Sequence, residues 1–226
     1  MRRRLVSLSF ALAVVLAFTG FVSSQGMEFT GGLTYNTYRV DFDGLEADLG
    51  ITNGFGFFLG GQYWVTDTIA VGGQIERLLI SGDASETYDA GGLPITAKAK
   101  ADGGSTGFLG TVTMDLGKSS AFRIQPFAAA GIYTLEVTET LTAPGYLPEE
   151  IRTVLKFDSR FGGKVGVNTR IQLTPTVVLN AFGAYRFISD FTEGTFRVGG
   201  DSRPMDDVVG WDLSGVSVGA GVVIGF

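Results

Sequence analysis

The chain contains no cysteine and no histidine among its 226 residues. Without cysteine there can be no disulfide, no thiol nucleophile and no zinc–thiolate site. Without histidine, Ser–His–Asp triads, most zinc sites and many general acid–base schemes are excluded. Because an enzyme would have to use carboxylates, lysine, serine or tyrosine alone, we expect no enzyme activity, no cofactor and no metal.

Proline is scarce, and long apolar runs are scarcer. Six prolines stand against 34 glycines and 18 phenylalanines, and the mean hydropathy is positive at +0.26. Only one stretch, at the start of the chain, is apolar enough to form a membrane helix. The remaining apolar residues are spread among glycines and β-prone aromatics, so the composition favours strands over helices.

The single apolar run belongs to an N-terminal targeting segment. Three arginines at positions 2–4 precede the apolar stretch 5–22, and small polar residues follow it. This order is typical of a signal peptide over residues 1–24 that is cleaved before Gln25. An uncleaved anchor is the alternative, because about 18 apolar residues can just span a bilayer. The arginine pair matches a twin-arginine signal poorly, so we expect export through the Sec pathway.

Removing the three arginines changes the formal charge from −6 to −9, because every acid lies beyond residue 24. A mature chain of this charge has no basic patch of the kind that binds nucleic acid. Many of the acids lie in the polar segments between the apolar ones, and they include the pairs Asp41/Asp43, Glu149/Glu150 and Asp206/Asp207. These pairs could bind calcium, but no spacing matches a calcium loop, which favours solvated acidic loops.

Residues 25–226 alternate between strand-like segments and polar connections, and form one predicted domain. In each strand-like segment, apolar residues occupy every second position. The predicted strands are residues 27–40, 53–64, 69–80, 106–116, 122–135, 157–171, 177–191 and 211–226. The connections at 65–68, 117–121 and 172–176 are short, and those at 41–52, 81–105, 136–156 and 192–210 are long. Since short and long connections alternate, all tight turns lie at one end, as in a transmembrane barrel.

The composition of the strand faces supports the same interpretation. Glycine and threonine dominate the polar faces, where an exposed strand of a soluble protein would carry lysine and glutamate. In a membrane barrel the apolar face points to lipid and the polar face to the interior. The prediction is therefore an all-β, eight-stranded, antiparallel up-and-down barrel in the outer membrane, with four long acidic loops outside. A soluble, secreted, lipocalin-like barrel with an apolar cavity is an alternative.

Charged residues fall on the predicted inward faces at corresponding depths. They are Glu76, Arg160, Lys164 and Arg186. An eight-stranded barrel is only wide enough for side chains to fill it, and a buried charge must be paired. We therefore expect an ion-pair network, centred on Glu76, that plugs the lumen. A narrow cation-lined pore for anions is the alternative.

Aromatic residues gather near both ends of the predicted strands. Tyr63, Trp64 and Phe122 lie near the short turns, and Phe187 and Trp211 lie near the long connections. Two such girdles are typical of a barrel that meets two membrane interfaces. Pro126 is the exception to the pattern, because proline cannot donate to a ladder, and we expect a bulge there.

Three stretches carry a resemblance to a known family. They are 63–73 (YWVTDTIAVGG), 126–131 (PFAAAG) and the alternating C-terminal strand 216–226. With them, residues 28–226 resemble the small outer-membrane barrels of diderm bacteria, the superfamily that includes OmpA-type membrane domains, OmpX and OmpW. The resemblance implies that Phe226, with Ile224 and Val222, forms the signal read by the β-barrel assembly machinery. The family's enzymes use a catalytic histidine, which this chain lacks.

Together these features predict a monomeric outer-membrane protein with a structural or surface-interaction role. Its expected partners are outer-membrane lipid and lipopolysaccharide, with the assembly machinery during biogenesis. A narrow OmpW-like channel for small or apolar solutes is the alternative within the same fold.

Overall fold

The computed structural model describes residues 26–40, 53–89, 94–117, 122–144, 150–205 and 211–225. Within these residues every regular element is a strand. The strands are β1 (Met27–Thr37), β2 (Arg39–Val40), β3 (Asn53–Trp64), β4 (Ile69–Asp89), β5 (Pro94–Met114), β6 (Phe122–Thr142), β7 (Ile151–Gln172), β8 (Val177–Ile188), β9 (Gly194–Val198), β10 (Asp201–Met205), β11 (Trp211–Asp212) and β12 (Gly215–Gly225). No helix in the described part of the chain is long and apolar enough to cross a membrane.

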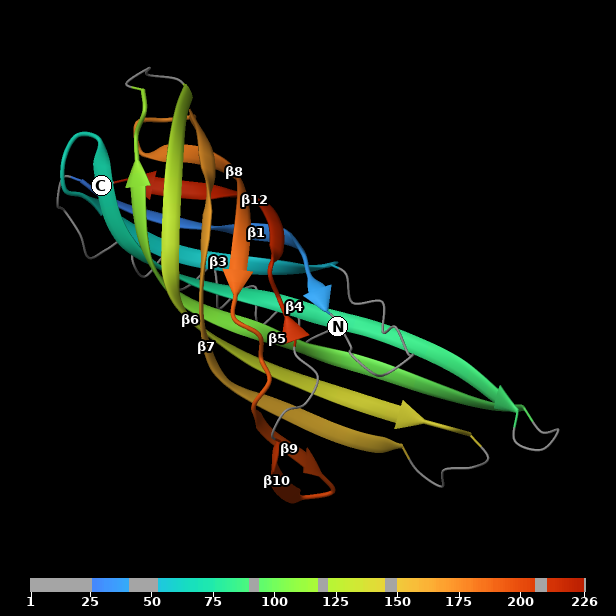
Figure 1. The fold of residues 1–226 in the computed structure, drawn as a ribbon. Helices are drawn as coiled ribbons and strands as arrows, with labels where there is room; N and C mark the ends of the chain where they lie inside the picture. Colours follow the sequence, from blue (N-terminus) through green and yellow to red (C-terminus); the bar gives the residue numbers. More distant parts are fainter. Residues whose placement is uncertain are drawn as a thin grey trace.

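Eight of the strands close into a ring (Figure 1). Each pairs antiparallel with its neighbours in the order β1, β3, β4, β5, β6, β7, β8 and β12, and β12 returns to β1. The closing pair runs from Glu28 opposite Gly225 to Asn36 opposite Ser217. Closure leaves no unpaired edge around the ring, which a bilayer requires of any strand that crosses it. The predicted eight-stranded up-and-down barrel is confirmed.

The outside of the ring is apolar. Side chains at alternate positions of every ring strand face outward and are exposed, among them Leu33, Phe55, Ile75, Phe108, Ile132, Phe161, Leu179 and Val218. A contiguous apolar surface of this size is unfavourable in water and suited to lipid. A lipocalin-like barrel would turn its apolar face inward, so the soluble alternative does not fit this exterior.

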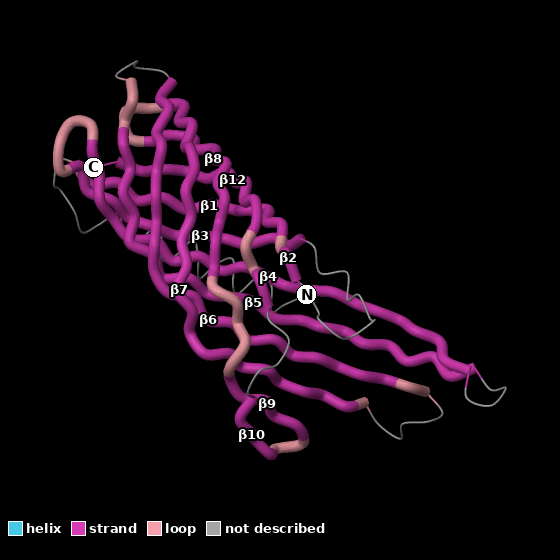
Figure 2. The backbone as a smooth tube through the Cα atoms, viewed as in Figure 1, coloured by secondary structure: helices cyan, strands magenta, loops and turns pink. Residues whose placement is uncertain are grey.

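Four neighbouring strands continue far beyond the ring. β4, β5 and β6 each have 21 residues and β7 has 22, whereas β1, β3, β8 and β12 have 11 or 12. About nine additional residues per strand project roughly 30 Å at the usual rise. Figures 1 and 2 show these strands running out from the barrel side by side. We call this part, residues 80–103 and 135–157 with β9 and β10, the projecting sheet.

The projecting sheet corrects three predicted loops. Residues 81–105 and 136–156 are mostly strand, because β4 and β5 pair as far as Asp89 and Pro94, and β6 and β7 pair as far as Leu141 and Ile151. Within 192–210, β9 and β10 form a hairpin that pairs with the upper part of β7. The fourth predicted loop, 41–52, lies outside the described residues.

The two faces of β4 to β7 exchange polarity at one level of the molecule. On β6 the outward residues run from Phe122 to Ile132 and are apolar below that level, and above it they are Thr134, Glu136, Thr138 and Thr140. The inward residues change in the opposite sense, to Leu135 and Val137, which are buried. The change falls at the row Arg77–Thr106–Thr134, whose members are paired across β4, β5 and β6. Outward apolar residues end where lipid ends, so this row marks the upper membrane boundary.

Pro126 lies within the β6 ladder without a bulge. It stands opposite Val167 in continuous register with β7, and the ladder with β5 stops at the adjacent residue, Phe127. The missing N–H therefore falls where pairing on one side ends, which is the position a strand proline tolerates. The register shift in β6 and β7 lies higher, between Tyr133 and Leu135. The predicted bulge at Pro126 is wrong.

Candidate functional site: the closed lumen and the projecting sheet

The centre of the lumen contains a buried ion pair. Lys164 donates to Glu76 across the barrel, with Nζ 2.5 Å from Oε2, and the Tyr133 hydroxyl donates to Oε1 at 2.7 Å. Glu76 is 3% exposed and Lys164 is 1% exposed. Gln74 adds a longer bond of 3.3 Å to the same carboxylate. These three donors give the buried carboxylate the hydrogen-bond partners that a buried charge needs.

Arg186 belongs to a second polar group nearer the long-connection end. Its Nη1 donates to Asn36 Oδ1 at 2.9 Å, and its Nε donates to the Leu213 carbonyl at 3.0 Å. Ser217 donates to the same Asn36 oxygen, and the guanidinium lies 5.5 Å from the centre of the Tyr38 ring. The sequence did not single out Asn36, although its spacing on an inward face marked it as a lumen residue.

Arg160 departs from the predicted network. Its Nη2 donates to Glu193 at 3.1 Å and to Thr192 at 3.2 Å, at the rim of the barrel. It is opposite Tyr133, the last pair before the register shift in β6 and β7. The predicted set therefore divides into three places: Glu76 with Lys164, Arg186 with Asn36, and Arg160 with Glu193.

Aromatic rings fill the lumen beside the ion pair. Phe182 packs edge-on against Phe58 at 5.4 Å and Phe127 at 6.2 Å between ring centres. Lys164 Nζ lies 5.7 Å from the centre of the Phe182 ring, a cation–π contact. Glycines opposite the rings make this packing possible: a Cβ on Gly219 would lie 2.5 Å from the Phe182 ring. An eight-stranded barrel has room for large side chains only where facing positions are small.

The long-connection end of the lumen contains a cluster of buried apolar side chains. The buried cluster consists of Tyr38, Leu78, Ile80, Ala101, Leu109, Ala129, Tyr133, Leu135, Val137, Leu155, Phe157, Ile188, Phe191, Met205, Trp211 and Leu213. Phe157 is at its centre, 6.1 Å from the ring of Phe191 and 6.3 Å from that of Trp211. Trp211 is 2% exposed and faces this cluster, so the prediction that it lies at the membrane interface is wrong. The buried side chains of the lumen are therefore apolar toward the long-connection end and include an ion pair below.

The short-turn end of the lumen is polar and less filled. Arg170 donates to Glu28 at 2.6 Å, and Gln62 donates to the same carboxylate oxygen at 2.7 Å. A cavity of about 120 Å³ lies here, and a second of about 50 Å³ extends from this end to Lys164 and Phe182. Arg170 lines both. Thr30 and Asn180 line the smaller one with polar atoms that have no protein partner. Its volume and lining suit bound water.

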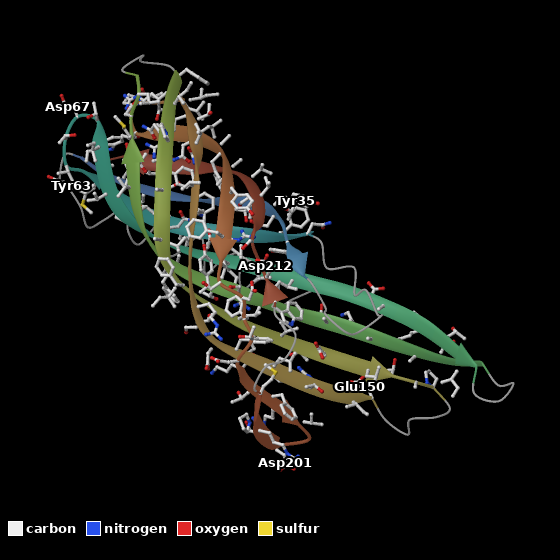
Figure 3. All side chains as sticks on the ribbon, viewed as in Figure 1. Tyr35, Tyr63, Asp67, Glu150, Asp201 and Asp212 are labelled. Carbon is white, nitrogen blue, oxygen red and sulfur yellow. The ribbon has the colours of Figure 1, made fainter. Side chains whose placement is uncertain are left out.

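The other predicted interface and assembly residues are mostly on the outer surface. Tyr63, Phe122 and Phe187 are exposed on outward positions, and Trp64 is half-buried. Figure 3 places Tyr63 near Asp67, at the short-turn end. Val222 is outward and exposed, and Ile224 is half-buried. Phe226 lies outside the described residues, so the assembly signal stays a prediction.

Among the described residues, one edge of the projecting sheet is long and has no strand paired to it, and the other edge is a short strand. β4 pairs with β3 from Ala70 to Leu78, and beyond Leu78 its described residues pair with β5 alone. The opposite edge is β10, which has five residues and contains Pro204. Figure 3 shows Glu150 toward the far end of the sheet and Asp201 in the β9–β10 hairpin. Among the described residues, no group of three or more acidic side chains could hold a metal ion.

Comparison with known proteins supports the fold. No protein-family model matches the chain, and no curated protein matches it in sequence. Among solved structures, a major outer membrane protein of Thermus thermophilus has a TM-score of 0.53 at 11% identity, over 89% of this chain and all of that one. The outer membrane protease OmpT of Escherichia coli (TM-score 0.49, 11% identity, 90% and 98% covered) and Neisserial surface protein A (0.46, 14%, 89% and 98%) are also similar.

The first of these three structures has a TM-score above 0.5. Together with the ring closure and the apolar exterior, it supports a transmembrane β-barrel fold of the kind that bacterial outer-membrane proteins have. At 11% identity, the likeness shows the fold and carries no information about activity.

Proposed function

We propose that this chain is an outer-membrane protein that holds a β-sheet at the cell surface for contact with other proteins. The barrel is its membrane anchor. The observation that carries the proposal is the continuation of β4 to β7 beyond the apolar band as a sheet with an open edge. The polar outward face of this sheet suits water, and the apolar inward face packs on the cluster that closes the lumen.

The open edge fits an extended segment of another protein. Residues 80–89 of β4 offer backbone N–H and C=O groups on the side away from β5, over a length sufficient for several ladder bonds. An added strand gains its affinity from the main chain, and its specificity comes from alternate side chains. Small residues at this edge, Ser81, Gly82 and Ala84, permit close approach. The β10 edge, short and interrupted by Pro204, does not offer the same ladder.

The lumen supports the anchor role over the channel alternative. The Glu76–Lys164 pair, the Phe58–Phe127–Phe182 layer and the upper apolar cluster succeed one another along the lumen. The two small cavities are the features that favour a channel; the larger lies at the short-turn end, and the smaller reaches as far as Lys164 and Phe182. We expect pure protein in planar bilayers to give no reproducible open channels. Reproducible channel openings would contradict the anchor role and support the channel alternative.

Docking is tested with unstructured peptides, because a natural partner need not be known. The full chain in lipid nanodiscs is used to select binders from a displayed library of unstructured peptides. We expect the selected peptides to slow hydrogen exchange of amides in residues 80–89. A variant in which residues 81–103 are replaced by an Asn-Gly turn should no longer bind the selected peptides. An equivalent shortening of the β6–β7 hairpin beyond Val137 is the matched control, and heat-modifiable migration shows that each barrel is folded.

Two outcomes would contradict docking at this edge: no enrichment of peptides, or protection confined to other strands. Several narrower statements stay predictions of the same proposal. They are the absence of enzyme activity, the monomeric state, Sec export with a signal peptide at 1–24, and recognition of the C-terminus by the assembly machinery.

A further inference from the structure

The outward face of the projecting sheet carries more cations than acids, in contrast to the chain as a whole. From the boundary row upward, the outward positions of β4 to β7 and β9 hold six cations and five acids, namely Arg77, Lys98, Lys100, Arg152, Lys156 and Arg197 with Asp83, Asp89, Asp102, Glu136 and Asp158. The full sequence has a formal charge of −6. Cations are therefore concentrated on one face of an acidic protein, which favours an anionic ligand there.

Most of these cations are unpaired within the described residues. Lys100 forms an ion pair with Asp102 at 2.5 Å. Lys98, Arg152, Lys156 and Arg197 are exposed and lie within ion-pair distance of no described acid. Arg77 contacts a hydroxyl instead, donating to Thr106 at 2.7 Å. Charges without a partner in the protein are available to a ligand.

Hydroxyl groups run between the two columns of cations. The outward residues of β6 include Thr138, Thr140 and Thr142. Register places Thr140 opposite Lys100 on one side and Arg152 on the other, and Lys98 opposite Thr142. On the next strand, Arg197 is opposite Val154, between Arg152 and Lys156. Cations flanking a row of hydroxyls suit a ligand with several phosphates and sugar hydroxyls.

The position of this face specifies the source of the anion. It is the direct continuation of the lipid-facing wall. On the same outward face, the next positions above Ile75, Phe108 and Ile132 are Arg77, Thr106 and Thr134, respectively. The first cation therefore lies at the level where lipid chains end, and the others follow at successively greater heights. A headgroup attached to the neighbouring lipid reaches this surface without leaving the membrane.

We propose that the outward face of the projecting sheet binds the phosphate-bearing saccharide headgroup of an outer-leaflet glycolipid. Arg152, Lys156 and Arg197 contact its phosphates, and the threonine row contacts its sugar hydroxyls. Arg77 takes the phosphate nearest the lipid chains. The proposal rests on the outer-membrane location and is independent of protein docking at the β4 edge.

The β9–β10 hairpin supplies a matched pair of variants for the test. Arg197 lies on the outward face, and Arg203 is opposite Phe196 and therefore on the other face. Both are exposed arginines on the same short hairpin. Arg197→Gln and Arg203→Gln remove the same charge from the same element, so they separate the face from the net charge.

Binding is measured between the full chain in nanodiscs and deep-rough lipopolysaccharide, intact or with its phosphates removed. We expect Arg197→Gln to weaken binding about fivefold, and Arg152→Gln/Lys156→Gln/Arg197→Gln about 100-fold, at low salt. Arg203→Gln should leave binding unchanged, and Arg152→Lys/Arg197→Lys should retain most of it. The phosphate-free glycolipid should bind the unaltered chain as weakly as the intact one binds the triple variant.

Three results would overturn the proposal. Arg203→Gln weakening binding as much as Arg197→Gln would make the effect one of net charge. Equal binding of the phosphate-free glycolipid would remove the phosphate contact. Tighter binding of soluble heparin than of the glycolipid, through the same residues, would assign the face to a soluble sulfated polysaccharide. Heat-modifiable migration of each variant confirms that its barrel is folded, and none of these variants alters the β4 edge.

Discussion

The lower and upper parts of β4 to β7 belong to the same four strands, yet their faces have opposite polarity. Below the row Arg77–Thr106–Thr134, apolar side chains point outward, and Glu76 and Lys164 point inward. Above it, charged and hydroxyl side chains predominate among the outward residues, with Leu79 and Val154 as exceptions, and the lower inward side chains belong to an apolar cluster. The ladder itself continues without interruption between β4 and β5. The surroundings of a strand, and not its backbone pairing, therefore decide which face is apolar.

The difference also separates two ways of filling a narrow barrel. The lower lumen contains buried ions that need partners, and it retains small cavities lined by polar atoms. The upper lumen is closed by rings and aliphatic side chains that need no partners. A change that unbalances a charge below should therefore cost more than the loss of any exposed charge above.

The largest expected effect is loss of the Glu76 carboxylate. Glu76→Gln leaves Lys164 buried without its counter-ion, and we expect the free energy of unfolding to fall by about 3–5 kcal/mol. Glu136→Gln removes an exposed acid above the boundary and should change it by less than about 0.5 kcal/mol. Urea unfolding in lipid vesicles measures both. Equal stability of Glu76→Gln and the unaltered chain would show that the pair is not needed.

A similar loss is expected when the upper cluster is opened. Phe157→Ala removes the ring between Phe191 and Trp211, and should cost about 3–5 kcal/mol in the same unfolding assay. Val154→Ala, outward on the same strand, is the matched control and should cost under about 1 kcal/mol. If both substitutions had the same small effect, the upper cluster would not be a packed core.

Two positions on one face of β6 test the boundary itself. Ala128→Arg places a cation among lipid chains, well away from the interface, and should cost about 2–4 kcal/mol. Thr134→Arg, six residues further on the same face, should cost about 0–1 kcal/mol. Unfolding of the two variants in vesicles gives the comparison. Equal costs would move the boundary away from Thr134.

The smallest expected effect concerns pH and lies above the boundary. Burial raises the pKa of the Glu139 carboxyl, which faces inward in the projecting sheet. The folded state therefore binds a proton more tightly than the unfolded one, so stability falls as the pH rises from the ordinary value of 4.5 through the raised pKa. Glu139→Gln should reduce this fall and stabilise the sheet at neutral pH. A pH profile that Glu139→Gln leaves unchanged would exclude burial of this carboxyl as the cause.

The sequence was sufficient for the barrel because the evidence is repeated eight times. Alternation with a period of two, together with short turns at one end, determines which face meets lipid. The bounds of β3 agree with the prediction residue for residue, 53–64. The projecting sheet was missed because its serine, threonine, aspartate and glycine residues are common in loops.

A signal for the projecting sheet was nevertheless present. Ala97, Ala99 and Ala101 alternate with Lys98, Lys100 and Asp102, which is strand alternation with the polarity reversed. The positions of Arg160 and Trp211 carried no such signal. Arg160 reaches Glu193 in the segment before β9, and Trp211 faces inward, where its ring packs near that of Phe157. Both positions depend on contacts between segments far apart in the sequence, which a local sequence pattern does not reveal.

The reversal of polarity along β6 is the central claim, and a cysteine scan tests it most directly. Since the chain has no cysteine, a spin label can be attached to one position at a time from Phe122 to Thr142, with the protein in vesicles. At outward positions we expect contact with oxygen dissolved in lipid up to Ile132, and contact with a water-soluble nickel complex from Thr134 onward. Inward labels at Leu135 and Val137 should contact neither. Lipid contact continuing at Thr138 and Thr140, or water contact already at Ala128, would contradict the account.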